Sequence, residues 1–68
     1  MYETVIYKIY MYVESINELV DMQDECKTIQ EAIQHCRLYF DKNPHDYLIC
    51  RYKPHTGKAT WHCALNYM

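Results

Sequence analysis

The fold is decided by two adjoining segments, TIQEAIQHCRLYFDKN at residues 28–43 and YLICRYKPHTGKATWHCALNY at residues 47–67. In the first, Thr28 followed three residues later by Glu31 matches a capping box, and Asn43 followed by a proline is a stop signal. Between these ends the apolar residues recur at spacings of three and four, as they do along one side of a helix. This apolar stripe consists of Ile29, Ala32, Ile33, Cys36 and Phe40. The sequence therefore predicts a helix over residues 28–43.

The second segment has the pattern of a β-hairpin, with its turn in KPHTGK at residues 53–58. Pro54 presets φ at the start of the turn, and Gly57, the only glycine of the chain, supplies a positive φ at its end. If the two lysines that flank the turn pair, one face of the hairpin is mostly apolar. That face carries Leu48, Cys50, Tyr52, Ala59, Trp61, Cys63, Leu65 and Tyr67. We expect the helix to dock on this face. The expected contacts join Ile33, Cys36 and Phe40 to Leu48, Trp61 and Leu65.

The chain before the helix alternates like a strand over residues 5–13. We assign to the core the side that carries Val5, Tyr7, Ile9, Met11 and Val13. The other side carries Ile6, Lys8, Tyr10, Tyr12 and Glu14. Residues 15–27 allow two alternatives, a short helix from a second capping-box match at Ser15 through about Met22, or a turn followed by a polar edge strand over 19–26. The predicted class is α+β, a small antiparallel-rich sheet with one main helix packed on one face. It has three strands, or four under the second alternative, in the order β, short connection, α, β, β.

A length of 68 residues predicts a single compact domain over residues 1–68. A chain this short buries only about 60% of the surface that its unfolded form exposes, so its stability is marginal. Half of the residues are hydrophobic and eight are tyrosines, which excludes a disordered chain. The N-terminus has no basic stretch followed by an apolar run, and polar or charged residues interrupt every apolar run. We therefore expect a cytoplasmic protein with neither a signal peptide nor a membrane span.

Four cysteines and four histidines raise the question of a metal site. Structural zinc sites usually take ligands in close pairs such as C-x-x-C, and the chain has no such pair. His62 and Cys63 are neighbours on a predicted strand, so their side chains point to opposite faces. We therefore expect no metal and no cofactor, and reduced cysteines with Cys36, Cys50 and Cys63 in the core. The alternative is a disulfide between Cys50 and Cys63, which are diagonal neighbours in the predicted register.

Catalytic patterns are weak in this sequence. The only serine, Ser15, already has a capping role, and a single glycine excludes a phosphate-cradling loop. A domain of this size has little room for an enclosed pocket. We therefore expect that the protein is not an enzyme.

Tyrosines and basic residues gather on the mixed side of the predicted sheet, which a single helix would leave open to solvent. Tyrosine and arginine are enriched at protein interfaces. The predicted partner-binding residues are Lys8, Tyr10, Tyr12, Tyr47, Ile49, Arg51 and His62. A second candidate surface is acidic, because residues 14–25 contain five acids and no base. It consists of Glu14, Glu18, Asp21, Asp24 and Glu25.

These surfaces predict a small non-enzymatic binding protein that occupies the surface of a partner protein, as an inhibitor or modulator. Size alone suggests a phage or another mobile element as its source, and self-association as a homodimer belongs to the same prediction. The alternative is a binder of single-stranded nucleic acid, or a component of a nucleoprotein assembly, that uses the tyrosine-rich sheet face. A net charge of −2 argues against tight nonspecific binding to duplex nucleic acid.

Overall fold

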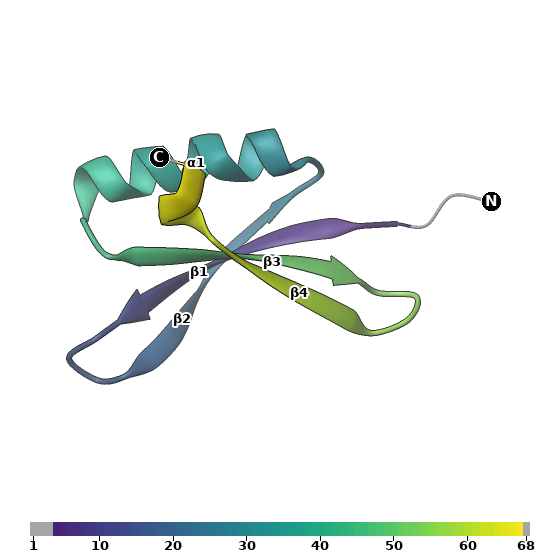
Figure 1. Cartoon of the computed structure of the whole chain (residues 1–68), viewed down its shortest axis with the longest axis horizontal. Coiled ribbons are helices and arrows are strands. Elements are labelled where there is room, and N and C mark those ends of the chain that lie inside the picture. Colours follow the sequence, from purple (N-terminus) through teal and green to yellow (C-terminus); the bar gives the residue numbers. More distant parts are fainter. Residues whose placement is uncertain (1–3, 68) are drawn as a thin grey trace.

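A computed structural model describes residues 4–67 as a four-stranded antiparallel sheet with one helix lying across one of its faces (Figure 1). The elements are β1 (Ile6–Val13), β2 (Glu18–Cys26), α1 (Ile29–Lys42), β3 (Asp46–Lys53), β4 (Lys58–Cys63) and a closing 3₁₀ turn η1 (Ala64–Tyr67). The predicted α+β class with one main helix is confirmed. Of the two alternatives for residues 15–27, the turn with an edge strand is the one observed, so β2 stands where a short connection was expected.

The strand order is β2-β1-β3-β4, so β2 and β4 are the two edges of the sheet. The predicted hairpin register between β3 and β4 is confirmed, with Lys53 opposite Lys58 and Cys50 opposite Trp61. Gly57 has φ of +72°, the left-handed conformation for which the turn requires a glycine. The helix carries the chain from β2 at one edge to β3 in the middle, where β3 pairs with β1.

Both helix ends follow from local chemistry. The Thr28 hydroxyl accepts a hydrogen bond from the Glu31 backbone N–H at 3.2 Å, as its place before the first helical residue predicts. At the other end, Asn43 is extended rather than left-handed, with φ of −149°. Its carbonyl instead accepts a hydrogen bond from the Tyr47 hydroxyl at 2.6 Å. A tyrosine on β3 therefore satisfies a backbone group where the helix stops.

The core lies between the helix and the sheet face that carries Tyr7, Ile9 and Met11 of β1, as predicted for the first strand. For the hairpin, the predicted inner face is wrong. Ile49 and Tyr47 are fully buried, whereas Trp61 remains 47% exposed. Ile9 pairs with Ile49, and directly paired residues project from the same face of a sheet. The core sets chosen for β1 and for the hairpin therefore lay on opposite faces, and only one of the two could meet the helix.

The buried residues of the helix match the predicted stripe except in the last turn of the helix. Ala32 and Cys36 are fully buried, but Phe40 is 37% exposed and Trp61 lies on the other face of the sheet, so the predicted docking of Phe40 on Trp61 is wrong. Phe40 and Leu65 do line one surface depression. Tyr39 takes the inward place and stacks on Tyr47, with ring centroids 5.9 Å apart. Both tyrosines also end in hydrogen bonds, which lets their polar tips lie among buried groups.

None of the helices described within residues 4–67 is long and apolar enough to cross a membrane.

Candidate functional site

The predicted partner-binding residues divide between the two faces of the sheet. Strand alternation and pairing place Lys8, Tyr10 and Tyr12 on the face away from the helix, which we call the open face. The other four residues lie on the helix side, and they are Tyr47, Ile49, Arg51 and His62. Tyr47 and Ile49 are fully buried in the core, so their expected exposure to a partner is wrong. They are buried because the hairpin presents to the helix the face that was predicted to be open to solvent.

The open face is rich in aromatic and apolar side chains, although α1 and η1 both lie on the opposite side of the sheet (Figure 1). It carries Ile6, Tyr10 and Tyr12 of β1, Leu48, Cys50 and Tyr52 of β3, and Ala59, Trp61 and Cys63 of β4. Within the described residues 4–67, no further element covers this face. The strand residues expected inside the hairpin core therefore lie on a face without a helix, where they range from buried Cys50 to Trp61, which is 47% exposed.

Tyr10 and Trp61 form the centre of the open face. Their ring centroids are 5.2 Å apart, with the ring planes tilted by 57°. Because β3 lies between β1 and β4, the two rings meet across β3. Cys50 of β3 shares this face and is only 4% exposed, which we attribute to the cover of these rings. The two aromatic side chains thus restrain each other.

The charged groups of the open face are mainly acidic. The Lys8 ammonium lies 3.6 Å from an Asp21 carboxylate oxygen and 5.7 Å from the centre of the Tyr10 ring. Its contact with Tyr10, then the charge of Asp21, raises the pKa of Lys8 above its usual value. Glu25 pairs with Lys8, and Asp46 pairs with Tyr12, so both acids share this face. One paired lysine therefore stands among three acids.

Residues 14–25 form the turn after β1 and most of the edge strand β2. Four of the five acids are exposed, and they are Glu14, Glu18, Asp21 and Glu25. A charged edge strand resists pairing with the strands of other molecules. The fifth acid, Asp24, is half-buried and points toward the helix, so it does not belong to the acidic surface.

An irregularity in β2 accompanies this arrangement. From Lys8 to Tyr10, β1 advances two positions, while its partners on β2 run four positions, from Glu25 to Asp21. The two additional residues include Gln23, which has φ of +56°. Because the shift is even, residues on either side of the irregularity keep their faces.

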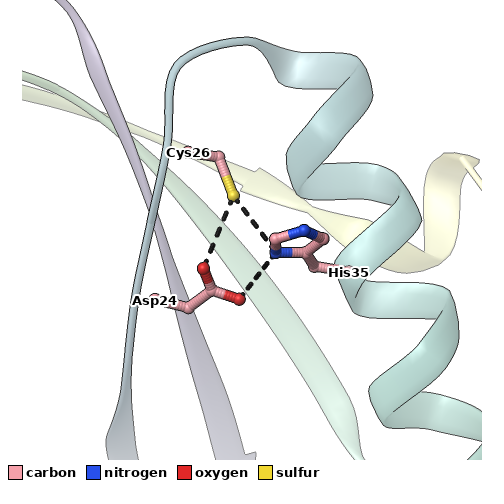
Figure 2. A group of neighbouring side chains, drawn as sticks. All are labelled: Asp24, Cys26 and His35. Carbon is pink, nitrogen blue, oxygen red and sulfur yellow. Dashed lines mark hydrogen bonds and ion pairs between the residues drawn. The ribbon is translucent and has the colours of Figure 1, made fainter.

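A polar cluster joins β2 to the helix on the inner side of the sheet (Figure 2). Asp24 and Cys26 are two positions apart on β2, and His35 faces them from α1. The His35 Nδ1 atom lies 2.7 Å from Asp24 Oδ2 and 3.4 Å from Cys26 Sγ. The Cys26 thiol lies 3.7 Å from Asp24 Oδ1. The Tyr39 hydroxyl donates a hydrogen bond of 2.5 Å to Asp24 Oδ2.

Electrostatics set the protonation of the cluster. Burial alone would raise the pKa of Asp24, but hydrogen bonds from Tyr39 and His35 outweigh it and hold that pKa below its usual value. Burial, reinforced by the charge of Asp24, raises the pKa of the Cys26 thiol to about 12. The hydrogen bond to Asp24, followed by burial, raises the pKa of Tyr39 to about 12. The cluster therefore holds one carboxylate, with a neutral thiol and a neutral phenol beside it at neutral pH.

This arrangement does not suit nucleophilic catalysis by Cys26. The attacking species would be the thiolate, whereas the local environment favours the thiol. The side chain is also only 2% exposed, so a substrate would not reach the sulfur.

The four cysteines are free thiols in the structure. Cys26, Cys36 and Cys50 are buried and Cys63 is half-buried. The expected core position of Cys36 is confirmed. Cys50 and Cys63 lie on the open face instead of in the helix-covered core, because the hairpin presents its other side to the helix.

Sequence reasoning missed the grouping of Asp24, Cys26 and His35. A search for paired cysteines does not find this grouping, because it contains only one cysteine. The signal in the sequence is D-x-C, and on a strand the two side chains of that motif lie on the same face. The third member arrives only when the helix docks beside β2. Comparison of the chain with known protein families, with curated proteins and with solved structures found no match.

Proposed function

We propose that this protein is a non-enzymatic binding protein that covers a surface patch of a partner protein with the open face of its sheet. The observation that carries the proposal is the aromatic pair of half-buried Tyr10 and exposed Trp61 on a face that no described element covers. Contiguous exposed apolar surface on a small protein commonly marks an interaction site.

The residue types and their rigidity support this use. Tryptophan and tyrosine are enriched among the residues that dominate binding energies at interfaces. The ring contact between Tyr10 and Trp61 restrains both side chains in the free protein. Tyr12 is held as well, because its hydroxyl donates a hydrogen bond to Asn17 in the turn after β1. A surface restrained in this way loses less conformational entropy on binding.

The charges of the open face define the partner. Asp21, Glu25 and Asp46 border the aromatic centre, and the lysine among them is already paired. The matching surface is an apolar patch on a protein, with basic residues around its rim. An inhibitory or modulatory role follows from this proposal, because covering a partner's surface blocks other contacts there. The cytoplasm remains the proposed location. If the partner is a second copy of this chain, the proposal predicts self-association through the same face.

Binding of single-stranded nucleic acid is the second candidate, favoured by the two adjacent rings, on which bases could stack. The charges oppose it. Arg51, which was expected among the tyrosines, lies on the helix side, and the acids that border the rings would repel phosphates. Protein binding is therefore the better-supported function.

The experiment compares two double variants of matched character. Tyr10→Ala with Trp61→Ala removes the aromatic centre, whereas Leu38→Ala with Ile16→Ala removes two exposed apolar side chains that lie on the helix and in a turn. A photo-crosslinking residue at position 52 of the open face identifies the partner, and the purified partner is then titrated with each variant. We expect each open-face change to cost at least about 2 kcal/mol of binding free energy, roughly 30-fold in affinity.

Circular dichroism confirms that both double variants are folded, and gel filtration reports self-association. Unchanged partner affinity and unchanged self-association in the open-face variant would contradict the proposal. Crosslinking to nucleic acid, with affinity that falls steeply with salt, would establish the second candidate in its place.

A further inference from the structure

We propose that Asp24, Cys26 and His35 form a binding site for one divalent transition-metal ion of the zinc class. The ion would join the edge strand β2 to α1 on the helix side of the sheet. The site is separate from the open face, so this inference does not depend on the binding function proposed for that face. The carboxylate, thiol and imidazole donor atoms all lie within 4.8 Å of one another. Figure 2 shows the three side chains converging from two elements on a common point.

The donor separations are close to those that a bound ion requires. Around a tetrahedral Zn²⁺, with Zn–S of about 2.3 Å and Zn–N or Zn–O of about 2.0–2.2 Å, neighbouring donors stand roughly 3.4–3.6 Å apart. The Cys26 sulfur lies 3.4 Å from His35 Nδ1 and 3.7 Å from Asp24 Oδ1. His35 Nδ1 lies 2.7 Å from the other carboxylate oxygen, Asp24 Oδ2, so the side chains must turn until one Asp24 oxygen stands at ligand spacing from both the sulfur and the imidazole nitrogen. Small rotations of the His35 and Asp24 side chains supply that change.

The chemistry of the donor set selects the ion. Sulfur and imidazole ligands suit zinc and its neighbours, whereas Mg²⁺ and Ca²⁺ prefer oxygen alone. A thiolate and a carboxylate together neutralise a doubly charged ion, which matters because Cys26 is almost fully buried. Tyr39 donates to Asp24 from outside the donor set, the usual arrangement around a ligating carboxylate.

Loading the site moves two protons. The Cys26 thiol loses its proton to solvent as the S–Zn bond forms. The hydrogen bond to Asp24 requires a proton on His35 Nδ1, so this proton must leave before that nitrogen can bind the ion. In the neutral imidazole that proton is carried on Nε2 instead, so this step changes the tautomer of His35 and the thiol proton is the one released to solvent.

Three protein ligands leave a fourth position for water or another small ligand. Asp24 and His35 line a shallow depression of about 220 Å³ together with Leu38, Tyr39 and Lys42. A water molecule occupies about 30 Å³ of liquid, so the depression has room for one. The ion can therefore enter from this side and complete its coordination there.

The test titrates the untagged, chelator-treated full chain with ZnCl₂ by calorimetry and with CoCl₂ by absorption spectroscopy. We expect one saturable site, and for Co²⁺ the visible bands of a tetrahedral complex together with thiolate-to-metal charge transfer. Thermal unfolding should shift upward with Zn²⁺ and return after chelation. Tyr39→Phe, which changes only the outer hydrogen bond, should weaken binding by roughly 10- to 100-fold. Asp24→Asn and His35→Ala should weaken it further.

Matched controls use residues of the same types away from the cluster. Cys63→Ser and His55→Ala should leave affinity and spectra unchanged, because one lies on the open face and the other in the β3–β4 turn. Cys26→Ala should abolish the charge-transfer band. If Cys26→Ala unfolds the chain, weakened binding in Asp24→Asn and His35→Ala shows instead that the ion binds at this cluster. Absence of saturable binding, or binding that survives those two changes, would overturn the proposal.

Discussion

The identity of the buried sheet face can be tested by truncating one residue on each face of the hairpin. Ile49 is fully buried beneath the helix and pairs with Ile9, whereas Trp61 is about half exposed on the open face. Ile49→Ala removes three carbons, which at about 0.8 kcal/mol each is roughly 2.4 kcal/mol of lost burial. The cavity term brings the expected loss to about 3–4 kcal/mol, within the usual range for such changes.

Trp61→Ala should cost less although it removes a larger side chain. About half of the indole is already in water, and its contact with Tyr10 is worth about 1 kcal/mol. The whole domain has a free energy of unfolding of about 3–10 kcal/mol, estimated from its length of 68 residues. The two variants should therefore differ by a large fraction of the total stability.

The assay is urea unfolding followed by far-ultraviolet circular dichroism, since fluorescence would be lost with the only tryptophan. It is run at a concentration where gel filtration finds monomers. Ile49→Val, expected to cost about 0.5–1.5 kcal/mol, provides a graded value if the alanine variant does not fold. Leu38→Ala, at an exposed helix position, should stay within about 0.5 kcal/mol of the parent. A larger loss for Trp61→Ala than for Ile49→Ala would mean that the helix covers the other face.

Three further outcomes are expected. Thr28→Ala removes the oxygen that caps the first turn of the helix, and should lower the free energy of unfolding by about 1 kcal/mol in urea titrations, whereas Thr28→Ser should restore most of it. Tyr39→Phe removes a hydrogen bond to a carboxylate, and should cost the metal-free protein about 1.5–3 kcal/mol in the same assay; no loss would mean that the bond to Asp24 contributes little. Alkylation of the native protein, followed by mass spectrometry, should label Cys63 before the three buried cysteines; early labelling of Cys26 would contradict its burial and its pKa of about 12.

Only part of the candidate sites could be read from the sequence. Lys8, Tyr10 and Tyr12 were assigned to the open face correctly, because the core side of β1 is marked by its own apolar residues. Trp61, which lies at the centre of that face, was assigned to the core because large apolar residues are usually buried. The cluster of Asp24, Cys26 and His35 depends on β2 being a strand at all, and its polar sequence left that question open.

The sequence by itself determined the features that depend on neighbouring residues. The capped start of the helix, the turn with its single glycine, the register of Lys53 with Lys58 and the alternation of β1 each arise from interactions within a few positions. Only the tertiary structure decided which face of the hairpin meets the helix. Alternation gives a strand two faces, and here both carry large apolar residues, Ile49 on one and Trp61 on the other. The choice between them came from the pairing of β3 with β1, which places Ile49 beside Ile9 and brings together residues forty positions apart.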